Sequence, residues 1–557
     1  MIKYINYKKG NKMGLSLSAE QKTLIKIFKI EEQYIIPAYQ RPYSWEYDEC
    51  FTLYSDIMEA FHDKKNKDDY FIGNIVIAKS NVVKDKLEVI DGQQRLTTLL
   101  LLIKVLSVFS PEHKALKSCL EIEDWESDDT FPRIESAIFE SNDKKSFEEV
   151  LSFNKEKFEI HLKKCIDKKG KFLERKCSNR FETNIIFFYN WIKYYSQKND
   201  LKDFIRYLLT QVYLLPIELE GRTPEEAREK ALKIFETINN RGKELSDADI
   251  FKARLYDKAI RVKEEKEFID GWKNLKSSCD LQGVKIDDIF RYYSHVIRGR
   301  ELKTSSEINL RHFFTRLDYS PFNLKNYKEI LNDLFRLVEV IEFINEERQK
   351  SSKLAKWLQL IELYTNQYPK ILLVVYLFER GYNEKKLIEF SKRLVRYAYY
   401  KGSTTTIKFE IFNMIKEICI GKDINTYIEE DVNTSQFNYL GGLKNGYALL
   451  SFYSVQDKAL QSYSIDRLIT YLDKKQLSKK WKEDEIKEAG ESLGNFIVLD
   501  IKKKNIPIEK KISYYAESKI STVKQVVLLL KSFDYKNFQK RDREMKDNLV
   551  AFFQGKN

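Results

Sequence analysis

The residues best suited to chemistry lie at a break in an apolar stretch, LEVIDGQQRLTTLLL, from Leu87 to Leu101. The residues before the break are typical of the end of a strand, Gly92 lets the backbone turn, and leucines then recur at helical spacing. The pattern therefore predicts that Gln93, Gln94 and Arg95 begin a helix. Unpaired N–H groups at a helix N-terminus favour an anion, and an arginine there can add a bidentate phosphate contact.

Asp91 stands immediately before this turn and suits a magnesium ion, held directly or through water. Two strands, Phe71 to Ala78 and Lys86 to Ile90, are predicted to form a hairpin that delivers the chain to Asp91. A strand, a polar break and a helix also occur together as an ordinary connection in mixed folds. The residues alone leave that alternative open.

A second polar stretch, IPAYQRPYSW from Ile36 to Trp45, contains an arginine and a glutamine beside a proline. Pro42 restricts Arg41 to an extended conformation, because the proline ring clashes with a helical residue before it. We therefore expect a stiff loop that presents Gln40 and Arg41 to a ligand.

A third polar stretch, NNRGKELS, lies between two predicted helices. The first helix is predicted from a capping box that begins at Thr223, and the second from a similar box that begins at Ser246. Asn240 and Arg241 between them favour a role in ligand binding. A structural helix hairpin, which needs only Gly242 for a left-handed turn, is the alternative.

Length and composition predict a folded protein of two to four domains, because 557 residues exceed one core and 43% of them are hydrophobic. No apolar run approaches the roughly 18 residues of a membrane span, and no apolar region follows the first lysines. We therefore expect a cytoplasmic protein with no membrane partner. Six scattered cysteines without a C-x-x-C pair argue against a disulfide framework or a zinc site.

The net charge of +13 favours a polyanionic partner such as nucleic acid. Residues 501–557 carry 14 Lys and Arg against 6 Asp and Glu, so the excess is concentrated near the C-terminus. A solvated lysine-rich face is the alternative explanation.

Four motifs occur in a fixed order: IPAYQRPYSW, YFIGNIVIA from Tyr70 to Ala78, the DGQQR stretch, and FETINNRGKELSDADIFK from Phe235 to Lys252. This set resembles the N-terminal domain of the GmrSD family of modification-dependent restriction proteins, over about residues 15–260. The GmrS-type domain resembles ParB and sulfiredoxin nucleotide-binding folds.

The resemblance implies a site for a nucleoside triphosphate with magnesium. Arg41 and Arg95 would hold phosphates, and Asp91 would orient magnesium or water. The glutamines would fix the nucleotide. Carried over position by position, the residues at or beside this site are Gln40, Arg41, Asp91, Gly92, Gln93, Gln94, Arg95, Asn240 and Arg241.

GmrSD-like chains commonly continue into a domain of the His-Asn-His nuclease class, and the C-terminal region resembles its later parts. Trp481, the segment LGNFIVL from Leu493 to Leu499, and Asn505 follow the family order. Where that class has Glu-His, this chain has Asp466 and Arg467.

Arginine stays protonated at any relevant pH, so Arg467 cannot serve as the general base, although it can hold a phosphate. The last histidine is His312, so the C-terminal region contains none that could replace it. We expect this domain to keep its fold and basic surface but to lack ordinary His-Asn-His cleavage. Asn495 and Asn505 would be remnants that fix local loops.

The predicted fold is an α/β (α+β) ParB/sulfiredoxin-like domain at residues 15–260, a largely helical middle at 261–425 and a small α+β His-Asn-His-like domain at 426–557. The leading prediction is a GmrSD-type anti-phage protein that binds and hydrolyses a nucleoside triphosphate and engages DNA, including modified phage DNA. One alternative is an active endonuclease with a non-histidine site. Another is a non-enzymatic, nucleotide-gated DNA sensor, with a homo-oligomer or a separate effector protein as its partner.

Overall fold

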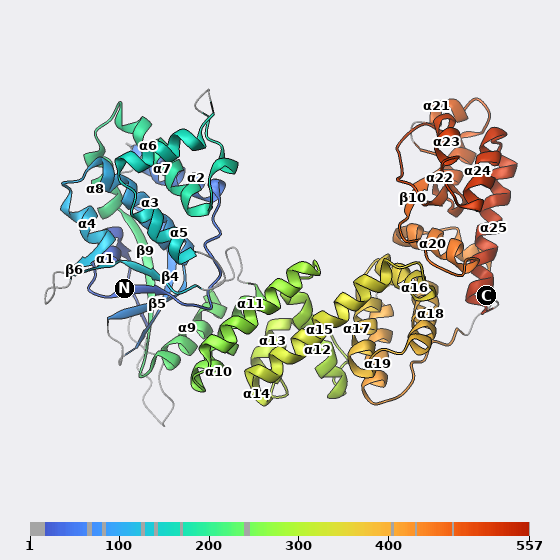
Figure 1. Cartoon of the computed structure of the whole chain (residues 1–557), viewed down its shortest axis with the longest axis horizontal. Helices are drawn as coiled ribbons and strands as arrows, with labels where there is room; N and C mark the ends of the chain where they lie inside the picture. The colour runs from blue at the N-terminus through green and yellow to red at the C-terminus, as the bar shows by residue number, and fades with distance from the viewer. Residues whose placement is uncertain are drawn as a thin grey trace. The chain divides into compact units, whose positions relative to one another are not determined.

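The computed structural model describes residues 17–63, 69–80, 85–123, 129–138, 143–167, 171–238, 246–402, 406–428, 432–470 and 473–555. The chain divides into two compact units, Met1–Ile269 and Asp270–Asn557 (Figure 1). The further division predicted at residue 425 stays a prediction. Within the described ranges, no helix has the length and apolar character that crossing a membrane requires.

A seven-stranded mixed sheet lies at the centre of the first unit. Its strands are β1 (Leu17–Ala19), β2 (Lys22–Thr23), β3 (Gln33–Ile36), β4 (Tyr70–Ser80), β5 (Lys86–Asp91), β8 (Ile134–Ser136) and β9 (Val212–Gly221). The order is β1-β9-β4-β5-β3-β8, and β2 also pairs with β9. β3 runs parallel to β5 and β8, whereas β4 is antiparallel to β5 and parallel to β9. A separate pair joins β6 (Glu121–Glu123) and β7 (Thr130–Pro132).

Helices cover both faces of this sheet (Figure 1). They are α1 (Leu24–Phe28), α2 (Tyr47–His62), α3 (Gln93–Phe109), α4 (Lys114–Leu120), α5 (Asp143–Leu151), α6 (Lys155–Cys165), α7 (Arg180–Ser196), α8 (Leu201–Thr210), α9 (Pro224–Ile238) and α10 (Asp247–Arg261). Side chains alternate along a strand, so Val89 of β5 packs with α3 on one face while Ile90 packs with α9 on the other. Both faces are therefore buried around the strand that leads to Asp91.

The local predictions for this unit are confirmed. β4 and β5 form the expected antiparallel pair, and the chain enters α3 directly after it. α10 begins after Ser246, whose hydroxyl accepts a hydrogen bond from the Asp249 N–H at 3.2 Å. The unit is a mixed α/β structure consistent with the predicted α+β class. Its likeness to ParB and sulfiredoxin folds stays a prediction.

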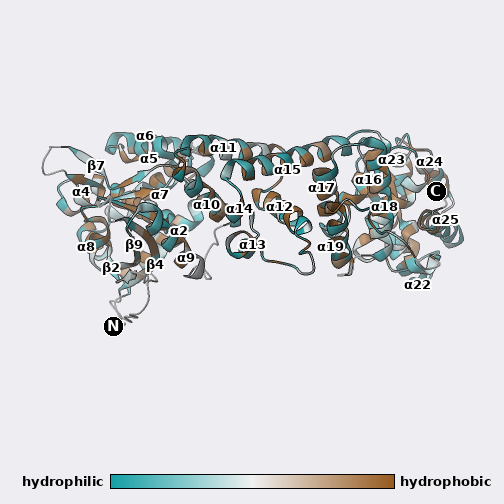
Figure 2. Cartoon of the chain, turned by 90° about the horizontal axis from the view of Figure 1, so that it is seen from below, coloured by the Kyte–Doolittle hydropathy of each residue, from teal (hydrophilic) through white to brown (hydrophobic). Residues whose placement is uncertain are grey.

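The second unit is predominantly helical, and α15 (Tyr327–Arg348) carries many hydrophilic residues along its length (Figure 2). Its first part, together with the helix that crosses the boundary, contains α11 (Glu265–Leu281), α12 (Ile286–Arg300), α13 (Leu310–Arg316), α14 (Pro321–Leu324), α15 (Tyr327–Arg348), α16 (Lys353–Glu362), α17 (Tyr368–Arg380), α18 (Glu384–Lys401) and α19 (Thr406–Cys419). The middle region is thus helical, as the sequence predicts.

The end of the chain combines one small pair of strands with helices. The elements are α20 (Lys444–Ser454), β10 (Ser464–Arg467), α21 (Lys474–Leu477), α22 (Glu483–Glu491), β11 (Phe496–Leu499), α23 (Ile508–Tyr515), α24 (Ser521–Lys531) and α25 (Tyr535–Phe553). β10 and β11 pair antiparallel, with Arg467 opposite Phe496. A His-Asn-His-like fold for this region stays a prediction.

Candidate functional site

The DGQQR stretch lies where β5 passes into α3. Gly92 is the N-cap of α3 and has a φ of 87°, a left-handed conformation that glycine adopts without strain. A β-carbon at this position would also collide with the side chain of Ile75. No side chain caps α3, so its first N–H groups point out of the helix without a capping acceptor.

Two of the predicted glutamines bind backbone on either side of this turn. The Gln40 amide nitrogen donates to the carbonyl of Ile90 at 2.8 Å. The Gln93 amide nitrogen donates to the carbonyl of Arg41 at 2.9 Å. These bonds join the loop after β3 to the end of β5 and the start of α3.

Gln94 completes the attachment of the same loop. Its amide nitrogen donates to the carbonyl of Pro42 at 3.3 Å, and its amide oxygen accepts from the N–H groups of Ser44 and Trp45 at 2.8 and 3.2 Å. All three glutamines are buried. The structure therefore brings the predicted residues together, but it uses their amides to hold the loop at 37–45. A ligand that took these hydrogen bonds would have to release that loop.

Within the described residues, Asp91, Arg95 and Arg41 form no ion pair. The Arg95 guanidinium donates to the carbonyl of Asn74, and no other hydrogen bond from it is found within the described residues. No ion pair within 4 Å joins Asp91 to Arg95 or Arg41. Burial raises the pKa of the Asp91 carboxyl, whereas both arginines and the Gly92 N–H oppose that rise.

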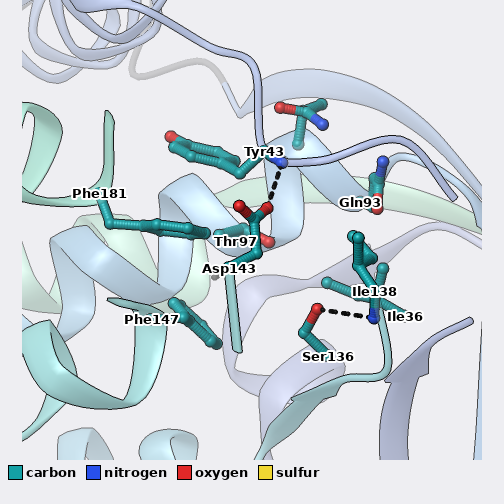
Figure 3. Close-up of a pocket in the computed structure, with 10 residues that line it drawn as sticks. Ile36, Tyr43, Gln93, Thr97, Ser136, Ile138, Asp143, Phe147 and Phe181 are labelled. Carbon is teal, nitrogen blue, oxygen red and sulfur yellow. Dashed lines mark hydrogen bonds between the residues drawn. The ribbon is translucent and has the colours of Figure 1, made fainter. Parts of the chain in front are cut away.

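A small cavity beside the glutamines lies between the loop, β8 and α5 (Figure 3). The Tyr43 N–H donates to the Asp143 carboxylate at 2.6 Å across one wall. The cavity measures about 10 Å³, which is room for about one water molecule. A cavity of this size cannot contain a nucleotide.

A buried network that the sequence analysis did not predict secures the same loop from α7. The Tyr43 hydroxyl lies 2.7 Å from the Thr98 hydroxyl. The Asn184 amide donates to the Tyr43 hydroxyl at 3.0 Å and to the Trp45 carbonyl at 2.9 Å. The signal in the sequence was the polar Asn184 within the largely apolar stretch FETNIIFFYNW. The structure shows that this asparagine is fully buried.

A second unpredicted group lies on the other face of β5. Arg228 of α9 makes a bidentate contact with Glu88 at 2.8 and 2.5 Å and contacts Asp257 at 2.5 Å. Its guanidinium also lies 5.6 Å from the centre of the Tyr39 ring. Arg228 therefore attaches α9 and α10 to the sheet behind the site. Asn240 and Arg241, which link these helices, lie outside the described residues.

Among the C-terminal candidate residues, Asp466 lies in a buried cluster with Lys511 and Tyr515. The Asp466 carboxylate is buried, accepts a hydrogen bond from the Tyr515 hydroxyl at 2.7 Å, and lies 3.6 Å from the ammonium of Lys511. Lys511 also donates to the carbonyl of Arg467. Burial lowers the pKa of Lys511, and the Asp466 carboxylate opposes this effect.

The remaining C-terminal candidates lie in contrasting surroundings. Arg467 is exposed, with its guanidinium 5.4 Å from the centre of the Phe496 ring. Asn495 is fully buried, accepts from the N–H of Ile469 at 2.7 Å, and donates to the carbonyls of Ile469 and Gly490. Asn505 is exposed. Among the residues that the structure describes, no group of three or more His, Cys, Asp or Glu could hold a metal ion.

Comparison with known proteins gives two matches. Residues 24–256 match the family described as the GmrSD restriction endonuclease, N-terminal domain. An uncharacterised protein of Methanocaldococcus jannaschii is 22% identical over 361 residues, which covers 59% of this chain and 57% of that protein. The chain thus matches little more than half the length of that relative.

Proposed function

We propose that the protein is a genome-defence NTPase that engages DNA, on the premise that residues 24–256 match the family of GmrSD restriction endonuclease N-terminal domains. The nucleoside triphosphate would bind where β5 meets α3. The basic surfaces of the chain, which carries a net charge of +13, would contact DNA, including modified phage DNA.

The observation that carries this proposal is the set of charges left open at the start of α3. Arg95 and Arg41 lie near Asp91. Among the described residues, no ion pair within 4 Å neutralises that carboxylate, and no side chain caps the helix. Guanidinium groups and helix N–H groups at one point are suited to phosphate oxygens. One guanidinium nitrogen of Arg95 donates to the Asn74 carbonyl. Arginine has five N–H donors, so Arg95 would keep donors for a phosphate.

The donor set also fits the magnesium ion that accompanies a nucleoside triphosphate. Magnesium is commonly held by one or two carboxylates together with phosphates and water. Asp91 would hold it, and the ion would neutralise charge on the phosphates. The chain's own contribution would be to orient the phosphates through Arg95 and Arg41 and to stabilise the charge that develops on them.

The test is phosphate release from ATP, GTP, CTP and UTP with magnesium, with and without modified DNA. Asp91→Asn and Arg95→Ala are each expected to lower the rate about 100-fold or more, since each removes a group that acts on the transferred phosphate. Arg206→Ala is the matched control, because Arg206 is exposed and, among the described residues, its ion-pair partner is the equally exposed Asp203. No turnover by the wild type with any nucleotide, or equal turnover in Arg95→Ala and Arg206→Ala, contradicts the enzymatic proposal.

A nucleotide-gated DNA sensor is the second candidate, and the glutamine contacts favour it. Gln40, Gln93 and Gln94 hold the loop at 37–45, so a nucleotide that takes their hydrogen bonds would release that loop. Nucleotide and DNA binding without turnover, together with copurification of another chain, supports this candidate over the enzyme.

We further propose that the C-terminal region performs no ordinary His-Asn-His cleavage. Arg467 stays protonated, and the neighbouring Asp466 is engaged by Tyr515 and Lys511. Degradation of plasmid or phage DNA by the purified protein that is lost on changing Asp466 would contradict this proposal. Degradation lost in Asp91→Ala would instead indicate an active nuclease that depends on the first unit.

A further inference from the structure

A second pocket of the first unit lies between α2 and α7 and shares no lining residue with the small cavity beside Gln93 and Gln94. Its volume of about 350 Å³ is at the lower end of the range for small-ligand sites. Most of its surface is aromatic or apolar, with one lysine. The lining side chains used below are Tyr54, Met58, His62, Trp191, Tyr194 and Lys198.

The aromatic side chains of this pocket are more accessible than packing alone would require. Trp191 is 37% exposed and Tyr194 is 58% exposed, whereas Tyr54 beneath them is only 2% exposed. The Tyr54 and Trp191 ring centres lie 5.3 Å apart, with their planes inclined at 53°. An open pocket with aromatic walls and an aromatic floor offers π-faces to a planar ligand.

The charge of the pocket decides between two ligand classes. Aromatic cages bind quaternary ammonium groups, and aromatic platforms also stack nucleobases. Here the ammonium of Lys198 lies 5.2 Å from the centre of the Tyr194 ring and donates to its hydroxyl at 3.3 Å. Among the described residues, no carboxylate lines the pocket. A cationic ligand would be repelled by Lys198, whereas a phosphate would be attracted.

The Tyr54 side chain also brings one polar group, its hydroxyl, to the base of the pocket. The Tyr54 hydroxyl is buried and makes no hydrogen bond with any described residue. Leaving a buried hydroxyl unbonded is unfavourable, so the edge of a ligand that reaches it would gain a hydrogen bond.

We propose that this pocket binds a nucleobase of single-stranded or extrahelical DNA. The base would stack on Trp191 and Tyr194, its edge would reach the Tyr54 hydroxyl, and Lys198 would contact the adjoining phosphate. The inference rests on the proposed engagement of DNA and is independent of nucleotide hydrolysis. Loss of oligonucleotide binding and loss of phosphate release can therefore be measured as separate outcomes.

The experiment compares two labelled oligonucleotides of about 15 residues, a thymidylate strand and an abasic strand with the same phosphates, on the full-length protein without nucleotide. Tyr194→Ala and Trp191→Ala are each expected to weaken thymidylate binding about 5- to 100-fold and to leave abasic binding nearly unchanged. Lys198→Ala is expected to weaken the binding of both strands. It should also reduce the number of counterions released on binding by slightly less than one.

Two controls separate the pocket from general surface effects. Phe131→Ala removes an aromatic side chain that is 47% exposed and does not line the pocket, and Lys155→Ala removes a positive charge from α6. Trp191→Phe keeps a stacking ring, so it should bind thymidylate but lose the quenching of tryptophan fluorescence that we expect when the wild type binds this strand. This variant keeps the test decisive if Trp191→Ala does not fold.

The proposal is overturned if the wild type binds the abasic and thymidylate strands equally well. It is also overturned if Tyr194→Ala and Phe131→Ala bind thymidylate with the same affinity. Binding of a tetramethylammonium probe that is lost in Trp191→Ala, with no preference for thymidylate, would assign the pocket to a cationic ligand instead.

Discussion

The junction of β5 and α3 in the first unit and the β10–β11 pair of the second unit both place an aspartate beside basic side chains at the end of a strand. Asp91 is only partly buried, and neither Arg95 nor Arg41 forms an ion pair with it within 4 Å. Asp466 is buried and is engaged by the Tyr515 hydroxyl and by Lys511. The first arrangement leaves its carboxylate without an ion pair to the two nearby arginines, whereas the second neutralises its carboxylate within the protein.

Amide side chains play the same part in both regions. Gln94 holds the loop beside Asp91, and Asn495 holds the segment that follows β10. The contrast therefore lies in the charges and not in the scaffold. It teaches that matching residue types at a strand end do not by themselves make a ligand site, and that the pairing of charges decides.

The largest expected effect comes from removing the cation of the buried cluster formed by Asp466, Lys511 and Tyr515. Lys511→Met should destabilise it by about 3 to 5 kcal/mol, because a buried carboxylate loses its cation. Lys510→Met, in the exposed neighbouring position, should change stability by no more than about 0.5 kcal/mol. Urea dependence of hydrogen exchange in β10 and α23 measures both. Equal effects of the two substitutions would mean that Lys511 is not buried with Asp466.

A glycine pair tests how strictly each region constrains its backbone. Gly92→Ala should destabilise the first unit by about 2 to 4 kcal/mol, since it combines a left-handed φ with a collision against Ile75. Gly490→Ala in α22 meets open space and should stabilise its helix by about 0.5 to 1 kcal/mol. Thermal unfolding of the two variants against the wild type checks the sign of each effect.

Acid should weaken the second unit through His295. Burial, Arg298 and Arg291 lower the pKa of this histidine to about 3, from 6.5 in an unfolded chain. The unfolded state therefore binds the proton first, and stability falls as pH drops below 6.5. The cost is about 1.6 kcal/mol between pH 6.5 and pH 5. His295→Leu should remove this loss, as read by unfolding of α12, and an unchanged slope would contradict the assignment.

Asp91 should respond to pH in the opposite direction, with the smallest effect. Burial raises its pKa above 3.8, so the folded state binds the proton more tightly and stability falls as pH rises through the folded pKa. Asp91→Asn should therefore be more stable than the wild type at pH 7 by no more than about 1 kcal/mol. The difference should close as pH falls below 4. A less stable variant at pH 7 would show that an internal partner neutralises Asp91.

The elements around the first site were predictable because their signals are local. Two short strand-like segments close together in the sequence predicted the β4–β5 pair, and the capping residue Ser246 predicted the start of α10. The apolar run after Gly92 predicted α3. Each of these signals lies within a few residues of the element that it specifies.

The side-chain roles were less predictable because their partners are distant in sequence. Gln40 was expected to bind nucleotide, but it bonds the carbonyl of Ile90, which lies 50 residues away. Glu88 meets Arg228 across 140 residues. The α2–α7 pocket was missed for the same reason, since Tyr54 and Trp191 contribute to it from separate helices and each alone is typical of a core position.

The sequence by itself determined the order of the motifs, the turn at Gly92 and the absence of a histidine after His312. Only the tertiary structure decided which charges are neutralised, with Asp466 paired inside the second unit and Asp91 left open in the first. The physical reason is distance. A hydrogen bond or ion pair needs its two atoms within about 3 to 4 Å, and packing alone brings remote segments that close.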